Sequence, residues 1–225
     1  MSRRFESAAE RATVEAVPGR TTTSAGPVVG ERSSIGPWEA AGPVASCVVQ
    51  TSWLLLRRRL RQPHDNLGRA IAFADGTSAA VYRETVVDRA PATEPAFLVV
   101  GFRLRLVRRP WAHAAFRAES LLNTVLFAGF PGLVSKLWLR HDQNGVYRGL
   151  YEWEGAALAR AYVDSLWWVL ALVSVPGSVR FAIVPGSRRD DVLTDPAVLG
   201  GQPAVGDGWW RPVSRTRPSA PLSHR

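Results

Sequence analysis

In the second half of residues 97–107 apolar and polar residues alternate, which is the period of a half-buried β-strand. The two faces of this segment separate in its second half, with Phe102, Leu104 and Leu106 on one and Arg103 and Arg105 on the other. The period then changes. From about Trp111 to Phe127 the apolar residues recur at helical spacing, after Pro110 and before Gly129.

Further periodic segments follow. Two short apolar runs flank the polar sequence around Asn144–Gly145, a dipeptide that favours a tight hairpin because both residues tolerate positive φ. A long apolar helix follows Gly155, and a last strand follows Pro176–Gly177. The pattern predicts an α+β unit in the order βαββαβ, at residues 97–107, 111–127, 133–140, 146–153, 156–173 and 178–184.

The rest of the chain divides by composition. Residues 1–45 are rich in small, polar and charged residues without a period, so we expect a disordered tail. The remaining boundaries are an N-terminal extension over 46–96, the βαββαβ domain over 97–186 and a Pro/Arg-rich tail over 187–225.

Two features stand out in these flanking parts. Residues 71–87 have the pattern of a β-hairpin that turns at Asp75–Gly76, and we expect it to extend the sheet or to cover a sheet edge. In the C-terminal tail, Trp209 and Trp210 are adjacent. Because exposed tryptophan pairs are uncommon on soluble proteins, we expect this pair to dock on the body or on a partner subunit.

Arginine supplies nearly all of the positive charge. The 225 residues carry a net charge of +9, and Lys136 is the only lysine. Clusters such as Arg57–Arg59 could contact phosphate, but the basic residues are spread along the chain. We interpret the bias as a general preference for arginine, and nucleic acid is not an expected partner.

Cysteine content and the distribution of apolar segments indicate the cellular compartment of the protein. Cys47 is the only cysteine, which excludes an intrachain disulfide and agrees with a cytoplasmic location. No apolar stretch follows Arg3 and Arg4, so we expect no secretory signal. The strongly apolar residues 165–179 are fewer than the roughly 20 that span a bilayer. We therefore expect no membrane partner.

No motif indicates a cofactor. The four histidines, His64, His113, His141 and His224, lack the close spacing of metal ligands, and no glycine-rich nucleotide loop or nucleophile elbow is present. We therefore expect no bound metal and no cofactor.

Two polar residues of the predicted helix 111–127 are candidate catalytic groups. His113 could act as a general base, since an imidazole titrates near neutral pH, or it could be a half-exposed residue of the first turn. Asn123 is either a polar group of a pocket or a solvent-facing residue.

Aromatic residues gather on the predicted hairpin. By parity Tyr147, Tyr151 and Trp153 share one face, and Trp138 lies on the neighbouring strand. Together with Trp168 on the last helix, they could bind a flat aromatic substrate, or they could form the core or a dimer interface. Arg148 and Glu152 point to the opposite face, and Arg103 and Arg105 likewise leave the first strand away from its apolar row. For these charges we expect solvent, a dimer interface or a clamp for an anionic ligand.

Three segments carry a family resemblance: Gly129–Trp138, Gly145–Trp153 and Ala156–Tyr162. Over about 90 residues the chain resembles the dimeric α+β-barrel superfamily, whose unit is ferredoxin-like, and within it the small mono-oxygenases of the YdhR and antibiotic-biosynthesis type. The resemblance implies a homodimer with a ligand pocket between each sheet and its helices. The first strand offers Gly101 and Arg103 but not the Asn of the haem-degrading relatives, which argues against haem chemistry.

The leading hypothesis is a cofactor-independent mono-oxygenase, or a related small enzyme, acting on a hydrophobic aromatic or polyketide-like molecule. In this hypothesis His113 is the base, and Asn123 and Tyr151 are hydrogen-bonding groups. The alternative is a non-catalytic ligand-binding or protein-interaction domain of the same fold, whose pocket is filled by its own Trp and Tyr side chains.

Overall fold

The computed structural model of the chain describes residues 26–105, 128–200 and 207–216. Its strands are β1 (Val28–Gly30), β2 (Leu60–Arg61), β3 (Ala70–Phe73), β4 (Ser78–Val87), β5 (Pro95–Arg103), β6 (Leu133–Leu139), β7 (Val146–Glu154), β8 (Arg180–Pro185) and β9 (Pro212–Thr216). Its helices are α1 (Pro37–Leu56), α3 (Ala156–Val173) and α4 (Arg189–Thr194), with a 3-10 turn, η1 (Pro196–Leu199).

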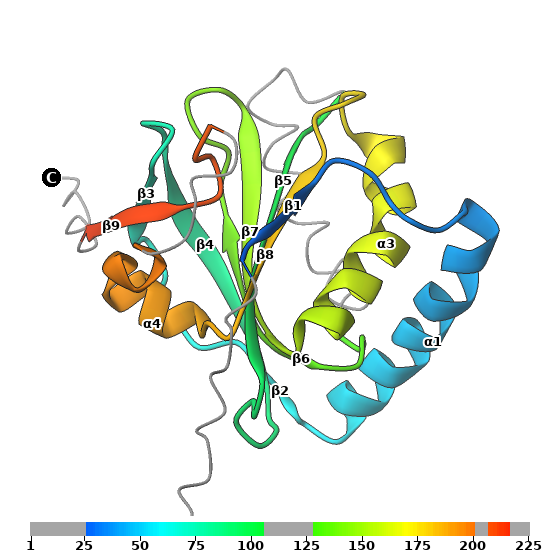
Figure 1. Ribbon diagram of the computed structural model, residues 1–225. Coiled ribbons are helices and arrows are strands. Elements are labelled where there is room, and N and C mark those ends of the chain that lie inside the picture. Colours follow the sequence, from blue (N-terminus) through cyan, green and yellow to red (C-terminus); the bar gives the residue numbers. More distant parts are fainter. Residues whose placement is uncertain (1–25, 106–127, 201–206, 217–225) are drawn as a thin grey trace, which may run out of the picture.

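The strands form one curled sheet in the order β1-β8-β5-β7-β6-β4-β3-β9, with β2 paired to β4 (Figure 1). All the pairings between described strands are antiparallel. β5, β6, β7, α3 and β8 lie within a few residues of their predicted places, and their order in the sheet, β8-β5-β7-β6, is consistent with a ferredoxin-like fold. The predicted helix 111–127 lies outside the described residues.

One face of the sheet is covered by helices. α3 lies against the strands, and α1 packs alongside α3 (Figure 1). α3 buries one stripe against the sheet, which includes Ala159, Tyr162, Val163, Leu166 and Leu170. By length and composition α3 is the one helix of the described residues that could cross a membrane, and 39% of it is buried inside the structure.

The N-terminal part is more ordered than its composition suggested. We expected disorder up to residue 45, but Val28–Gly30 pairs with β8 and Pro37 begins a helix of 20 residues. Gly42 and Pro43 disfavour a helix locally. Tertiary packing outweighs them, because Cys47 and Thr51 bury against the backbone at Gly129, where even a Cβ atom would collide.

The opposite face of the sheet has its own core, built with the C-terminal segment. It contains Val192, Leu193, Leu199, Trp209 and Trp210 together with side chains of β3 to β8. Both tryptophans are almost fully buried, so the expectation that they dock is confirmed. The Trp209 ring lies on Gly101 of β5, where a Cβ atom would come within 2.7 Å of the ring. The part of the predicted tail from 189 to 216 that the structure describes is therefore built into the fold.

Arg148 and Glu152 lie beneath this segment. Both residues lie on the face of the sheet that parity predicts. The expectation was that they contact solvent, a dimer interface or an anion, but both side chains are buried by other parts of the same chain. The Arg148 guanidinium binds the carboxylates of Asp75 and Asp142 and donates from Nε to the Trp209 carbonyl over 3.0 Å. Glu152 pairs with Arg188 at 3.1 Å, just before α4.

Asp142 is fixed by this arrangement. Burial alone would raise the pKa of its carboxyl, but the amides of Val146 and Asn144 and the Arg148 guanidinium together hold that pKa below its usual value. The carboxylate therefore stays charged at neutral pH and keeps the β6–β7 turn joined to Arg148.

The second core also bears on the predicted homodimer. That prediction had a physical reason, since a sheet with one helix-covered face needs cover for the other. In the described residues the chain itself supplies that cover, through α4, η1 and Trp209–Trp210. A homodimer stays a prediction, but the need to cover this face of the sheet is not a reason for it.

Arg148 can be tested directly. Arg148→Met should lower the free energy of unfolding by about 3–5 kcal/mol, because Asp142 would be left buried without its cation. Urea denaturation measures this change. The control is Arg61→Met, whose exposed ion pair with Asp88 should contribute less than about 0.5 kcal/mol. Equal midpoints for the two variants would contradict the arrangement.

Candidate functional site

Five of the predicted site residues lie in the described part of the chain. They are Trp138, Tyr147, Tyr151, Trp153 and Trp168. His113 and Asn123 lie outside it, so their predicted roles stay predictions.

Three of the five pack in the core between the sheet and the helices. Trp138, Tyr151 and Trp153 are buried there, and Tyr162 of α3 closes over them. The Tyr162 ring centroid lies 4.7 Å from that of Trp153 and 5.4 Å from that of Tyr151. The Tyr162 hydroxyl donates to the Tyr151 hydroxyl over 3.2 Å. These three side chains therefore belong to the hydrophobic core, which was one of the alternatives that the sequence left open for them.

Gly149 sets the position of the Tyr151 ring. A Cβ atom at Gly149 would come within 2.7 to 2.9 Å of the Tyr151 ring and hydroxyl, so the ring lies back over this glycine. Burial raises the pKa of Tyr151, which keeps the phenol protonated.

Two cations border the same aromatic cluster. The Lys136 Nζ lies 3.1 Å from the Trp138 ring centroid and 4.7 Å from that of Tyr151. The Arg83 guanidinium carbon lies 5.3 Å from the same Trp138 ring. Arg83 reaches this face after an irregularity in β4 at Tyr82, where the pairing with β6 shifts register. Burial, with Arg83 nearby, holds the pKa of the Lys136 amine well below its usual value.

Trp168 lies apart from this cluster. It is more than a third exposed, and its Nε1 donates to the Ile35 carbonyl over 3.0 Å. Next to this bond, Asp164 accepts hydrogen bonds from Ser34 and Arg160. Trp168 therefore helps to hold the segment that precedes α1 against α3.

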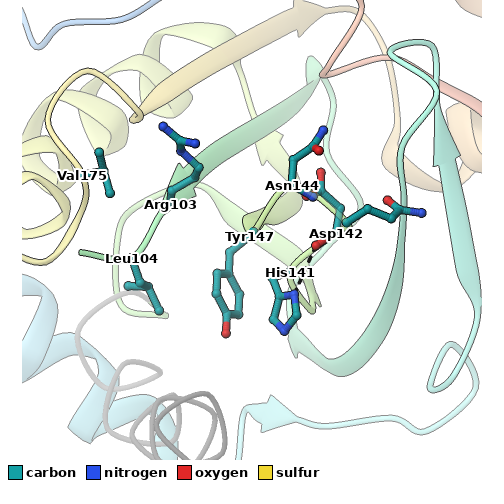
Figure 2. A pocket seen from close by; sticks show the side chains of 9 residues that line it. Arg103, Leu104, His141, Asp142, Asn144, Tyr147 and Val175 are labelled. Carbon is teal, nitrogen blue, oxygen red and sulfur yellow. Dashed lines mark hydrogen bonds between the residues drawn. The ribbon is translucent and has the colours of Figure 1, made fainter. Parts of the chain in front are cut away.

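An open pocket lies at one end of the sheet (Figure 2). Its volume is about 520 Å³. It lies between the end of β5, the β6–β7 turn and the residue that follows α3, and its lining is Arg103, Leu104, His141, Asp142, Gln143, Asn144, Gly145, Tyr147 and Val175. Tyr147 is the one predicted site residue in this lining.

The aromatic and apolar groups of the pocket lie together. Figure 2 shows the side chains of Leu104, Tyr147 and His141 extending to the same side of the opening. The Tyr147 ring stacks on Phe102 with centroids 5.9 Å apart, and the His141 ring meets it edge-on at 5.5 Å. These contacts hold a flat aromatic surface beside an imidazole.

The polar groups of the pocket favour an anion. Arg103 is exposed and extends toward the side opposite Tyr147 (Figure 2). The Asp142 carboxylate is turned away toward Arg148, so it adds little negative charge to the opening. The His141 Nδ1 lies 3.1 Å from the Asp142 carbonyl oxygen. A proton on Nδ1 in that bond places the ring's lone pair on Nε2.

Within residues 26–105, 128–200 and 207–216, no group of three His, Cys, Asp or Glu side chains is placed to hold a metal ion. The pocket's donors are instead an imidazole, a guanidinium and a phenol, which suit an organic anion.

Sequence reasoning missed two of the residues described here, His141 and Lys136, whereas it named Arg103 as a possible anion-binding charge. His141 follows the end of a strand, and alternation along a strand does not reveal which loops meet at a sheet edge. Lys136 had a signal, since it is the only lysine in an arginine-rich chain. That signal was interpreted through composition alone.

Comparisons with known proteins give few relatives. No family model and no curated protein matches the chain. One similar solved structure is an uncharacterized ferredoxin fold protein from Listeria monocytogenes, related to antibiotic biosynthesis monooxygenases. It has 13% identity and a TM-score of 0.35, and the alignment covers 50% of this chain and 66% of that chain, just under two thirds. Another is a major regulator of staphylococcal pathogenesis, at 11% identity and a TM-score of 0.34, covering 72% of this chain and 98% of that one. At these scores the assignment of the fold rests on the strand order.

The place of the Tyr151 ring gives a testable prediction. Gly149→Ala should lower the free energy of unfolding by about 1–3 kcal/mol, because the new methyl group needs the space that the ring fills. The control is Gly42→Ala in α1, where no atom lies within 4 Å of the new methyl and where alanine should stabilise the helix by up to about 1 kcal/mol. Urea denaturation compares the two, and equal stability of Gly149→Ala and wild type would contradict this packing.

Proposed function

We propose that the open pocket binds a small aromatic molecule that carries an acidic phenol, enol or carboxyl group, and that the protein oxygenates this molecule without a bound cofactor. The observation that supports the proposal best is that Arg103, His141 and Tyr147 line one space of about 520 Å³, with Arg103 on the side opposite the two rings. Such a volume suits a ligand of two or three fused rings.

The lining gives the ligand its chemical class. Tyr147, stacked on Phe102, borders the pocket with its aromatic side chain, and Leu104 and Val175 offer apolar contact. Arg103 offers a planar, permanently charged partner for a carboxylate, phenolate or enolate oxygen. A ligand that is apolar over most of its surface and anionic at one edge satisfies all of these groups.

The oxygenation needs a base and an electron-rich substrate. In this proposal His141 accepts a proton from an acidic C–H or O–H of the substrate, and Arg103 stabilises the resulting anion. The anion transfers electrons to dioxygen. For an activated CH₂ group the balance is CH₂ plus O₂ giving C=O plus H₂O, with one oxygen atom in the product and one in water. The predicted base His113 remains a candidate for the same step.

A non-catalytic binding domain is the second candidate function. One observation favours it: the cluster of Trp138, Tyr151, Trp153 and Tyr162 fills the described space beneath α3 with the protein's own side chains. Such a domain would use the open pocket for ligand capture alone.

Homodimerisation stays part of the proposal on different grounds. The outer side of α1 exposes large apolar side chains, namely Trp38, Val49, Trp53 and Leu56. A second copy that covers this surface would remove it from water without disturbing the C-terminal cover of the sheet.

The pocket can be tested with a panel of hydroxylated anthrones, naphthols and aromatic acids, using calorimetry for binding and an oxygen electrode for turnover. Arg103→Gln should weaken binding of the anionic members at least about tenfold, because a charge-assisted contact is lost, and it should spare neutral analogues. His141→Gln should lower oxygen uptake roughly a hundredfold, the scale of a lost general base, while binding changes little.

Arg61→Gln, far from the pocket on β2, is the control and should change neither quantity. Binding that depends on Arg103 without any oxygen uptake would support the binding domain over the enzyme. Absence of both binding and uptake across the panel would overturn the proposal.

A further inference from the structure

The only lysine of the chain lies in its interior. Of the 28 lysine and arginine residues, Lys136 alone is a lysine. Its side chain is 4% exposed, on the helix-covered face of β6. The remaining cationic positions of the chain use arginine, so this one position departs from the chain's own preference.

The surroundings of the amine are aromatic and cationic. The amine lies 3.1 Å from the Trp138 ring centroid and 4.7 Å from that of Tyr151. Arg83 approaches the same Trp138 ring, so two cationic side chains share one indole. A second positive charge at this distance opposes protonation of the amine.

A purely structural cation would not need a lysine here. Arginine stacks on aromatic rings at least as well, and Arg83 does so on the neighbouring strand. A guanidinium stays charged under all ordinary conditions, whereas an amine can lose its proton and become a nucleophile. Burial and Arg83 lower the pKa of Lys136, which increases the share of that neutral form at neutral pH.

We propose that Lys136 is a nucleophilic amine that forms an imine with the aldehyde or ketone group of a small aromatic carbonyl compound. The nitrogen lone pair attacks the carbonyl carbon to give a carbinolamine. The carbinolamine oxygen takes up a proton and leaves as water, the nitrogen loses its protons, and a C=N bond replaces C=O without any oxidation or reduction. Hydrolysis reverses the step.

The neighbouring groups suit this reaction. The rings of Trp138 and Tyr151 border the amine, so a carbonyl compound that reaches it meets aromatic side chains. The Tyr162 hydroxyl donates a hydrogen bond to the Tyr151 hydroxyl on the helix-covered face of the sheet. Both hydroxyls remain protonated because burial raises their pKa values. They can therefore serve as O–H donors when water leaves.

The single lysine makes the test simple. The full-length protein is incubated at neutral pH with salicylaldehyde and cyanoborohydride, which spares the free aldehyde and reduces the protonated imine to a stable secondary amine. Peptide mass mapping then separates labelling at Lys136 from labelling at the α-amino group of Met1. The same reaction in urea gives the rate for an unperturbed lysine.

A reactive Lys136 should be labelled at least about tenfold faster in the native protein than in the urea-unfolded chain, since each unit by which the pKa falls gives tenfold more neutral amine. Lys136→Arg should remove this label and leave labelling at Met1 unchanged. Arg103→Gln, in the open pocket, should not affect it, so the result is independent of the function proposed for that pocket.

A merely structural lysine gives the opposite result. Burial would then protect the amine, and labelling would be slower in the native protein than in urea, which would overturn the proposal. Should Lys136→Arg fail to fold, the ratio of native to unfolded labelling in the wild type decides the question alone.

Discussion

The buried guanidinium of Arg148 is the constraint on which the rest of the structure depends. It lies in the middle of the sheet's second face, over the Phe73 ring, with its centre 4.3 Å from the ring centroid. Its donors reach the β3–β4 turn through Asp75, the β6–β7 turn through Asp142 and the C-terminal segment through the Trp209 carbonyl. Because a buried charge is costly unless it is fully paired, these segments are stable only when they meet around it.

The two faces of the sheet are therefore covered in different ways. The second face is closed by the chain's own C-terminal segment, whose buried Arg189 pairs with the Glu84 carboxylate of β4. The open pocket lies at one end of the sheet and is lined from both faces, by Tyr147 on the helix-covered side and by Arg103 on the other. The amine of Lys136 is buried on the helix-covered face. Asp142 links the pocket to the second face, since it lines the pocket while its carboxylate binds Arg148.

The central strands and α3 could be predicted from sequence because their periods are long and regular. Parity correctly put Arg148 and Glu152 opposite Tyr147 and Tyr151. It could not show that those charges are buried, because the cover comes from a segment about 60 residues away in sequence that has the composition of a tail. α1 was not predicted, because the Gly42–Pro43 pair disfavours a helix locally, and packing against α3 and Gly129 outweighs that pair.

The candidate site was predictable only in part, for a similar reason. The aromatic residues were found by their strand positions, but which of them fills the core and which lines an opening depends on the helix above and on glycines such as Gly149. Arg103 and His141 meet only through the strand order, which brings the end of β5 beside the β6–β7 turn.

Native-state hydrogen exchange of the C-terminal segment tests the account most directly. The Arg211 amide donates to the Gly208 carbonyl, and the Ala74 amide donates to the Arg211 carbonyl, beside the buried Trp209 and Trp210. If this segment closes the second face, the Arg211 and Ala74 amides should exchange as slowly as those of central strand β7, through global unfolding. Exchange of these amides at the rate of an unstructured peptide, while β7 stays protected, would contradict the account.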